Sequence, residues 1–343
     1  MVKRILITGG GGFLARHFGE RLTHEQVALT LFDLAAPDWD SRAATVVIGD
    51  VRDRPALLRA ARGCDAVLHL AAAHHDSGLS PSTYHDVNEG GARTLCSVLD
   101  EVGIRNVCFF STVAVYGAAP EPRHEDTAPQ PTTPYGESKL AAERVFRDWV
   151  AAAKERRVLV VRPPVVFGAG NFANMYALIR QIDSGRFLRV GSGDNVKSLV
   201  YVDNLVDAAL LAWRRPATGF EIVNVVDKPD LTSREIADIV FRALGKKPPR
   251  VSIPLSLGIA LGLPFDAVSR ITGHRLSVST ARIRKYAADQ TKFEADKLLR
   301  LGFRAGVSLE EGLRRTVAWY QHEGRAKATK ERLPPASVMF SRA

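Results

Sequence analysis

Short apolar runs alternate with amphipathic stretches along the first half of the chain. The apolar runs have the length of buried strands and lie at residues 5–7, 28–32, 45–48, 66–70, 107–111 and 158–162. Helical patterns separate them at residues 15–22, 54–61, 90–102 and 135–154. Continuous apolar strands that alternate with helices are typical of a parallel sheet covered on both faces. The pattern therefore predicts an α/β protein with a doubly wound parallel sheet.

The regular alternation ends near Gly168. Residues 191–195, 246–249 and 254–264 are rich in turn-forming residues and proline, which predicts a smaller C-terminal lobe. Two later strand-like runs, 198–202 and 220–225, are expected to return to the main sheet. We therefore divide the chain into a main domain (1–171, with 196–225), a lobe (172–195 and 226–322) and a mobile basic tail (323–343).

A glycine-rich turn directly follows the first strand, and a helical pattern starts at once. It reads TGGGGFLA over residues 8–15. Gly9 permits a tight turn, Gly12 permits close approach of a pyrophosphate, and Ala15 is small where helix meets strand. Asp33 ends the next strand, where a carboxylate would accept hydrogen bonds from an adenosine ribose and disfavour a 2′-phosphate. The spacing predicts a Rossmann-type site for NAD, with an ordinary loop as the alternative.

Composition narrows the class of protein. Of 343 residues, 46% are hydrophobic and 24% are charged, which is typical of a globular protein, and the net charge is +10. We interpret this charge as a solvated basic surface; the alternative is attraction to anions such as nucleotide diphosphates, nucleic acid or an acidic membrane face. No nucleic-acid-binding motif occurs, so we expect no nucleic-acid partner. Without a signal peptide or an apolar run of spanning length, the sequence predicts a cytoplasmic protein.

The three cysteines predict buried thiols. Cys64, Cys96 and Cys108 lie in apolar patterns without a C-x-x-C spacing, so we expect reduced core residues and neither a disulfide framework nor a metal site.

Two residues four apart carry the candidate chemistry. Tyr135 and Lys139 lie on one face of a predicted helix, where the ammonium group would stabilise a phenolate. The phenol could then move a proton at a substrate hydroxyl or ketone. Thr112, at a predicted strand end, is the third candidate, and Ser111 is the second choice for its role. The alternatives are a surface pair and a capping hydroxyl.

Together these motifs resemble the extended short-chain dehydrogenase/reductase family, in particular its NAD-dependent sugar-nucleotide epimerases and dehydratases. The motifs, in chain order, are TGGGGFLA, Asp33, Asp50-Val51, HLAA at 69–72, STVAVYG at 111–117, YGESK at 135–139 and RPPVVFG at 162–168. The resemblance covers roughly residues 1–320. It implies a Rossmann-type doubly wound sheet with a smaller C-terminal substrate-binding lobe.

The resemblance also implies roles for matching positions. Thr112, Tyr135 and Lys139 would be the catalytic trio. The residues implied to bind NAD are Gly9, Gly12, Phe13, Leu14, Asp33, Asp50, Val51, Ala71, Ala72, Tyr135, Lys139 and Pro163. The candidate substrate contacts are Lys197, Arg282, Arg284 and His75, with a solvated helix face as the alternative for the arginines and loop polarity for His75. Asn88 is interpreted as structural.

Two departures from the family pattern restrict the activity. Dehydratases of this group carry an Asp-Glu pair after the catalytic threonine, whereas this chain has Val113 and Ala114, which cannot move a proton. Arg162 is followed by Pro163 without the asparagine that contacts substrate phosphate in many epimerases. We predict NAD-dependent oxidoreduction at C4 of a nucleotide-linked sugar by a 4-epimerase. The alternatives are a 4-keto-sugar reductase and a 3β-hydroxysteroid-type dehydrogenase.

An apolar stretch in the C-terminal half bears on where the substrate lies. Residues 253–265 read IPLSLGIALGLPF between Arg250 and Arg270, too short a stretch to span a bilayer. We expect a core helix of the lobe; the alternative is a patch that reaches a lipid-linked sugar by peripheral membrane contact. Because relatives often dimerise through four helices, we also expect a homodimer built on residues 90–102 and 135–154.

Overall fold

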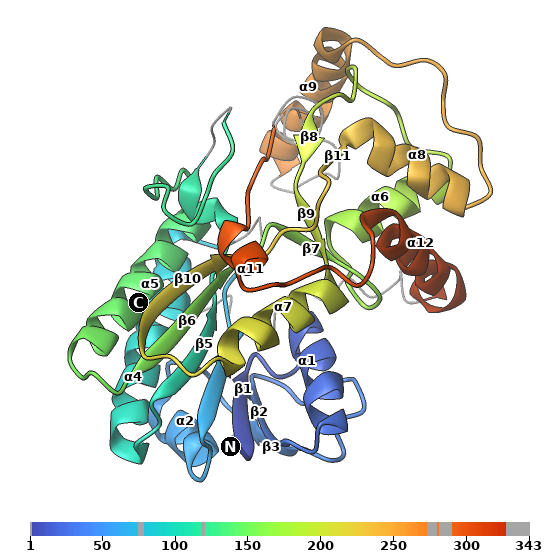
Figure 1. Ribbon diagram of the computed structural model, residues 1–343. Helices are drawn as coiled ribbons and strands as arrows, with labels where there is room; N and C mark the ends of the chain where they lie inside the picture. Colours follow the sequence, from blue (N-terminus) through green and yellow to red (C-terminus); the bar gives the residue numbers. More distant parts are fainter. Residues whose placement is uncertain (1, 75–78, 118–120, 273–279, 281–289, 327–343) are drawn as a thin grey trace.

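The apolar strands of the N-terminal half assemble into one parallel sheet. The computed structural model describes residues 2–74, 79–117, 121–272, 280 and 290–326 (Figure 1). Seven strands follow the order β10-β6-β5-β4-β1-β2-β3, and every neighbouring pair is parallel. Their bounds are β1 (Arg4–Thr8), β2 (Ala28–Asp33), β3 (Thr45–Ile48), β4 (Ala66–His69), β5 (Asn106–Phe110), β6 (Arg157–Arg162) and β10 (Gly219–Asn224). The predicted doubly wound fold is confirmed.

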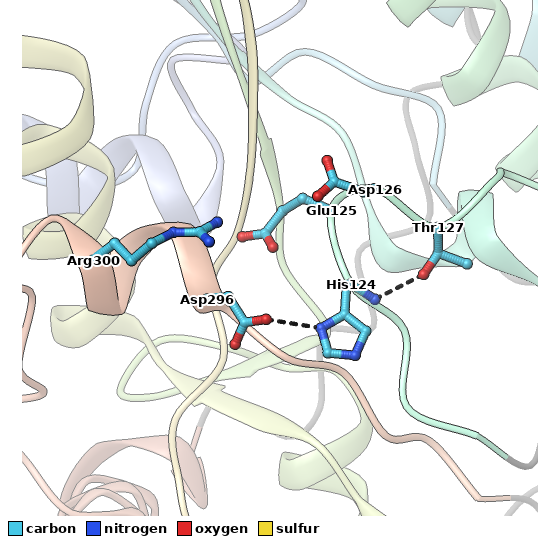
Figure 2. A pocket seen from close by; sticks show the side chains of 6 residues that line it. All are labelled: His124, Glu125, Asp126, Thr127, Asp296 and Arg300. Carbon is cyan, nitrogen blue, oxygen red and sulfur yellow. Dashed lines mark hydrogen bonds and ion pairs between the residues drawn. The ribbon is translucent and has the colours of Figure 1, made fainter.

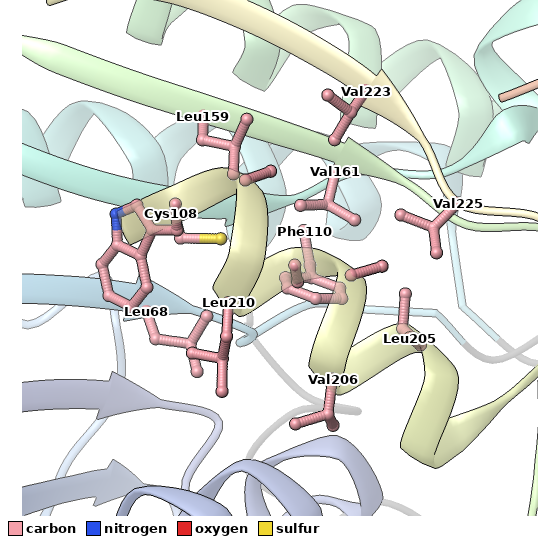
Figure 3. Close-up of a cluster of buried hydrophobic side chains, with 14 of the residues drawn as sticks. Leu68, Cys108, Phe110, Leu159, Val161, Leu205, Val206, Leu210, Val223 and Val225 are labelled. Carbon is pink, nitrogen blue, oxygen red and sulfur yellow. The ribbon is translucent and has the colours of Figure 1, made fainter. Parts of the chain in front are cut away.

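Alternate side chains of each strand enter two separate cores. Ile5 and Ile7 face α1 (Phe13–His24) and α7 (Val202–Arg214). Leu6 faces the other layer, α2 (Arg54–Ala61), α4 (Gly91–Val102) and α5 (Pro134–Ala151). Figure 3 shows the first core, where Leu205 and Leu210 of α7 lie against the sheet. Helices therefore bury both faces of the sheet, which explains why the strands are apolar at successive positions and not only at alternate ones.

The connections on the α4 and α5 side are short and helical. They comprise α3 (Pro81–Tyr84), the π-helical turn η1 (His85–Gly90) and the 3₁₀ turn η2 (Val113–Tyr116) after β5. The three cysteines are buried free thiols, as predicted. Burial raises the pKa of Cys96 to about 12 and that of Cys108 further, so neither thiol carries charge at neutral pH.

A third apolar cluster forms the core of the C-terminal lobe. It joins α6 (Asn174–Asp183), α8 (Ser233–Ala243) and α12 (Leu309–Trp319) to β7 (Val165–Phe167) and β9 (Leu199–Tyr201). The remaining elements are β8 (Val196–Lys197), β11 (Leu231–Thr232), α9 (Leu255–Thr272), α11 (Asp296–Arg300) and η3 (Tyr320–Gly324). Within the described residues, no helix is long and apolar enough to cross a membrane.

The second half of the chain corrects two expectations. The run 220–225 does join the main sheet as β10, but 198–202 does not: β9 pairs with β7, and β8 pairs with β11. The apolar sequence of a strand indicates that the strand is buried, but it does not identify the strand with which it pairs. Within the stretch 253–265, residues 255–265 are helical, yet Leu257, Leu261 and Leu263 are exposed, so the prediction of a core helix is wrong for the face that carries them.

Candidate active site

The glycine turn leaves no room for side chains beside the first strand. Gly9 has φ +73°, and its N–H donates to the Phe32 carbonyl at 2.8 Å. A Cβ on Gly9 would lie 2.7 Å from the backbone nitrogen of Ala71, which follows β4. Gly12 is the N-cap of α1 and brings no capping side chain to the free N–H groups of the first turn. Phe13 and Leu14 begin the helix there. This backbone cradle fits the pyrophosphate of a dinucleotide.

Asp33 holds the same turn from the next strand. Its Oδ2 accepts from the Gly11 N–H at 2.8 Å and its Oδ1 from the Leu34 N–H at 2.6 Å. The carboxylate therefore stands at the end of β2 beside the glycines, where the sequence predicted it.

Asp50 and Val51 follow β3 at the neighbouring edge. Burial opposes the charged form of Asp50, but hydrogen bonds from Arg52, including one of 2.6 Å, outweigh it and lower the pKa of Asp50. Val51 is buried against Gly91, where an added Cβ would lie 2.9 Å from the valine. Ala71 is tied to β1, because its N–H donates to Thr8 Oγ1 at 3.4 Å. The predicted cofactor residues of four strand ends thus lie along one edge of the sheet, and this set fits NAD.

The start of α5 places Tyr135 beside the loop after β5. Thr133 caps the helix by accepting from the Gly136 N–H at 3.1 Å, and Pro134 occupies the first turn. A Cβ on Gly136 would lie 2.7 Å from the Ala114 carbonyl oxygen, so the helix packs directly on η2. Thr112 is the N-cap of η2. The half-buried Tyr135 ring lies against Tyr84, with centroids 6.3 Å apart.

Lys139 is buried one turn further along α5. Its Nζ lies 4.3 Å from the centre of the Phe109 ring, and its exposed fraction is 1%. Burial lowers the pKa of Lys139 to about 7, although Glu143 opposes the shift. Burial and then the charge of Lys139 lower the pKa of His69 to about 3, so this histidine is neutral, with Nδ1 2.6 Å from Thr8 Oγ1. Burial therefore makes Lys139 much easier to deprotonate than an exposed lysine.

The two hydroxyls after β5 are used differently. Ser111 donates to Glu143 Oε1 at 2.5 Å and is buried. Thr112 Oγ1 accepts from the Ala114 N–H at 3.1 Å, which leaves its proton available to a substrate oxygen. The geometry therefore favours Thr112 over Ser111 for the third catalytic position.

A buried ion pair behind these residues escaped the sequence analysis. Arg162 donates to both oxygens of Glu143, at 2.9 and 2.5 Å, and each side chain is 1% exposed. Arg162 also lies over the Tyr116 ring at 4.7 Å. The signal was present: Glu143 follows Lys139 by four residues on an apolar helix face, and Arg162 ends an otherwise apolar strand.

Two further residues fix the loops around this pair. The Pro163 carbonyl accepts from the Val113 N–H at 3.1 Å, which joins the end of β6 to η2. Asn88 is buried and bridges Ala73, whose N–H it accepts at 2.8 Å, to Ser138, to which it donates at 2.9 Å. This geometry agrees with the structural interpretation of Asn88.

The structure describes only one of the four predicted substrate contacts. Lys197 is half-buried in β8, paired with Leu231 of β11. His75, Arg282 and Arg284 lie outside the described residues. Ala72 follows Ala71 at the end of β4, and the neighbouring His74 is exposed.

A separate hollow lies where the loop before α5 meets α11. It has a volume of about 350 Å³ and is lined by His124, Glu125, Asp126, Thr127, Asp296 and Arg300 (Figure 2). His124 pairs with Asp296 at 2.9 Å, and Glu125 accepts from the backbone N–H of Asn224, the last residue of β10. Because none of the predicted site residues lines it, we treat it as a joint between the lobes and not as the active site.

Comparison with known proteins agrees with this geometry. Residues 5–225 match the NAD dependent epimerase/dehydratase family, and the chain belongs to it. It is 38% identical, over 93% of its length and 96% of the relative's, to N-acetyl-alpha-D-glucosaminyl-diphospho-ditrans,octacis-undecaprenol 4-epimerase of Escherichia coli O157:H7. It is 27% identical, over 92% of its length and 95% of the relative's, to UDP-glucose 4-epimerase of Vibrio cholerae.

Solved structures share the architecture. A double mutant of a dTDP-glucose 4,6-dehydratase from Streptomyces venezuelae, with NAD bound, has a TM-score of 0.76 at 25% identity, covering 95% of this chain and 100% of that one. The UDP-glucose 4-epimerase of Thermus thermophilus, in complex with NAD, has a TM-score of 0.75 at 24% identity, over 93% and 99% of the two chains; this likeness shows the fold alone. The predicted family and an NAD-dependent enzyme are confirmed.

Proposed function

We propose that this protein is an NAD-dependent 4-epimerase whose substrate is a sugar joined through a diphosphate to a lipid carrier. The lipid-linked class is favoured over a nucleotide sugar because the relative named for such a substrate is 38% identical over 93% of the chain, against 27% for the UDP-glucose 4-epimerase of Vibrio cholerae.

One feature of the site carries the choice of epimerisation. Tyr135 and Lys139 share a face of α5 beside Thr112, while the residues after Thr112 are Val113, which is buried, and Ala114. Elimination of water from the sugar ring needs a second acid and base at that place, and neither side chain can exchange a proton. The trio therefore supports oxidation and reduction at one carbon without dehydration.

The chain's own residues move the proton and hold the oxygen. The Tyr135 oxygen takes the proton of the sugar 4-hydroxyl and later returns it to the opposite epimer. The ammonium group of Lys139 stabilises the phenolate, and the Thr112 hydroxyl donates a hydrogen bond to the C4 oxygen. Bound NAD supplies reversible acceptance of a hydride. Between the two transfers the 4-keto sugar turns over in the site, so the configuration at C4 is inverted without net oxidation.

The remaining assignments follow from the same proposal. Gly9, Gly12, Phe13 and Leu14 hold the pyrophosphate, Asp33 the adenosine ribose, Asp50 and Val51 the adenine, and Ala71, Ala72 and Pro163 line the nicotinamide side. Lys197, with Arg282, Arg284 and His75, contacts the sugar diphosphate. Residues 1–171 with 202–225 bind the cofactor, and 172–195 with 226–322 bind substrate; residues 196–201, predicted to belong to the cofactor part, pair outside the main sheet and include Lys197. Two copies associate through α4 and α5.

The proposal is tested with purified protein and no added cofactor. A lipid-diphosphate-linked N-acetylhexosamine and the corresponding nucleotide sugar are incubated separately, and the released sugars are separated by chromatography. We expect interconversion of the two C4 epimers from the lipid-linked substrate, approached from either side. A strict need for stoichiometric reduced cofactor would establish the reductase instead, and conversion of the nucleotide sugar alone would overturn the lipid-linked class.

A further inference from the structure

The C-terminal lobe gathers large apolar side chains on its surface. Among the described residues twelve large apolar side chains are exposed, and five of them fall within two short segments. We call these five the apolar ridge: Leu188 (64% exposed), Val251 (80%), Leu257 (51%), Leu261 (51%) and Leu263 (57%). Scattered apolar side chains are ordinary on a protein surface, but a group of this kind marks a contact site.

Pairing between the two segments brings the ridge together. Val190 and Ile253 are partners in a parallel bridge, with the Gly191 N–H donating to the Ile253 carbonyl at 2.8 Å. Leu188 and Val251 each lie two residues before this bridge, on the two segments that it joins. The α9 helix is held against the same segment, because Gly258 is packed on Val190. Figure 1 shows α9 at the end of the molecule opposite the N-terminus.

The helix presents its apolar residues on a side that the lobe does not cover. Leu257 and Leu261 are one turn apart, so both project from one face of α9. Gly258, between them, is buried toward Val190. The helix therefore has a covered side and an open side.

Most of the charge next to the ridge is positive. No acidic residue occurs in 184–193 or in 239–265, whereas these segments contain Arg186, Arg189, Arg242, Lys246, Lys247 and Arg250. Three of the six are paired with acids at the borders: Arg189 with Asp238, Arg242 with Glu310 and Lys246 with Asp183. Arg186, Lys247 and Arg250 are exposed and make no ion pair with any described residue. Two of them adjoin the ridge, since Arg250 precedes Val251 and Arg186 lies two residues before Leu188.

We propose that the apolar ridge and its cationic border dock this protein onto the surface of an anionic lipid bilayer. Exposed leucines with adjacent unpaired cations are the combination that binds a membrane interface. A second copy of the chain fits less well, because a two-fold contact would bring together the same cations, which form no ion pair with any described residue. The inference rests on the proposed function: a lipid-linked sugar has its carrier in the bilayer, and docking brings the active site to it.

Vesicle co-sedimentation of the full-length protein tests this docking. The probes are vesicles of phosphatidylglycerol with phosphatidylcholine, and vesicles of phosphatidylcholine alone, each at low and high salt. We expect binding to the anionic vesicles that weakens with salt. Replacing Leu257 and Leu261 by Gln should weaken it at least about tenfold, and replacing Arg186, Lys247 and Arg250 by Gln about fivefold for each cation removed. The matched control, L211Q with L299Q, removes two exposed leucines from α7 and α11 and should bind as the parent does.

Activity assays distinguish a failure of the docking proposal from a failure of the proposed function on which it rests. Each variant is assayed with the sugar diphosphate on a short, water-dispersed prenyl chain and on a long chain held in vesicles. L257Q/L261Q should lose activity only on the vesicle-held substrate. Absence of binding to anionic vesicles at low salt, with the vesicle-held substrate still turned over, would overturn the docking face and leave the function standing. If the variant changes the oligomeric state of the protein and not its vesicle binding, the ridge is an interface between copies and the inference is wrong. Failure on both prenyl substrates, with vesicle binding intact, would instead count against the proposed function.

Discussion

Glu143 lies one helical turn after Lys139 on α5, and its carboxylate raises the pKa of an amine that burial alone would lower further. The carboxylate is itself held by Arg162 and Ser111 inside the protein. Because Lys139 must be charged to stabilise a phenolate, Glu143 sets the pH range in which the proposed base works. Its effect on the reaction passes through Lys139, so it is a positioning residue.

Replacing Glu143 by Gln should move the alkaline limb of the kcat profile to lower pH. The Lys139 ammonium is present below its pKa, about 7, and is lost as pH rises through that value. Without the carboxylate the pKa falls, so activity should decline earlier and the deficit should grow between pH 6 and 8. The measurement is kcat against pH for parent and variant.

Arg162→Gln is the matched control for lost stability. Both variants break the same buried pair and should cost a similar ~3–5 kcal/mol of unfolding free energy. Arg162→Gln keeps the carboxylate near Lys139, however, so its alkaline limb should not move toward acid. If the alkaline limb of the kcat profile moved to lower pH by the same amount in both variants, the shift would reflect damage to the fold and not the charge of Glu143.

The two hydroxyls after β5 should respond very differently to substitution. Thr112→Val removes the donor for the C4 oxygen and should lower kcat by about 100-fold, with Thr112→Ser restoring most of it. Ser111→Ala removes a hydrogen bond that ends on Glu143, and should cost about 1 kcal/mol of stability with little change in kcat. Steady-state kinetics of the three variants checks this, and a larger loss of kcat in Ser111→Ala than in Thr112→Val would reverse the assignment.

Most of this site was predictable because its residues lie where strands end. The apolar runs located all seven strands of the sheet, and parallel strands bring their carboxyl ends to one edge, so Gly9, Asp33 and Thr112 had to lie along the same edge. What the sequence analysis missed is the burial of charge. Glu143 follows Lys139 by four residues on the same helix, but only the packing of α5 on β6 shows that it meets Arg162 inside the protein.

Substitutions at two glycines can separate the cost of a left-handed backbone from the cost of a side chain that has no room. Gly9→Ala forces an alanine into φ +73° and also places Cβ 2.7 Å from the Ala71 nitrogen, so the purified variant should contain little NAD. Gly63 has nearly the same φ, +74°, but open space around it. Gly63→Ala should therefore cost about 1–2 kcal/mol of stability from the left-handed backbone alone and retain its NAD. Cofactor content is read from the absorbance of the released nucleotide; full NAD in Gly9→Ala would contradict the proposed cradle.

A buried carboxylate in the lobe should make stability depend on pH in an unusual direction. Burial raises the pKa of Asp227 to about 6, although Tyr201 N–H and Asn204 donate to it. The pKa of Asp227 is higher in the folded protein than in the unfolded chain, where it is near 4. The protonated carboxyl group therefore stabilises the folded protein fully below pH 4, and this stabilisation is lost as pH rises through 6. Asp227→Asn removes the charge and keeps an acceptor, so it should increase the unfolding free energy by about 2–3 kcal/mol at pH 7.5 and not at pH 4.

Asp203→Asn is the control, because it should change the unfolding free energy in the opposite direction. A hydrogen bond from His17 lowers the pKa of Asp203, so neutralising this carboxylate should reduce stability at neutral pH. Urea unfolding of both variants at the two pH values gives the comparison, and a destabilised Asp227→Asn at pH 7.5 would contradict the argument from burial.

The lobe was harder to predict than the sheet for a physical reason. Its strands are two or three residues long, and so short an apolar run does not reveal its partner, as the pairing of β9 with β7 shows. The apolar stretch 253–265 was correctly placed in a helix, but hydrophobicity alone could not tell a core face from the exposed ridge. Only the contact of Gly258 with Val190 shows which side of α9 is covered.

The most direct test follows a deuterium label at C4 of the substrate. In ordinary water and without added cofactor, the product epimer should keep the deuterium at C4. Tyr135→Phe should retain NAD but turn over about 10²–10⁴-fold more slowly. Loss of the label to solvent, or undiminished turnover in Tyr135→Phe, would contradict the proposal that this phenol serves a reversible oxidation at C4.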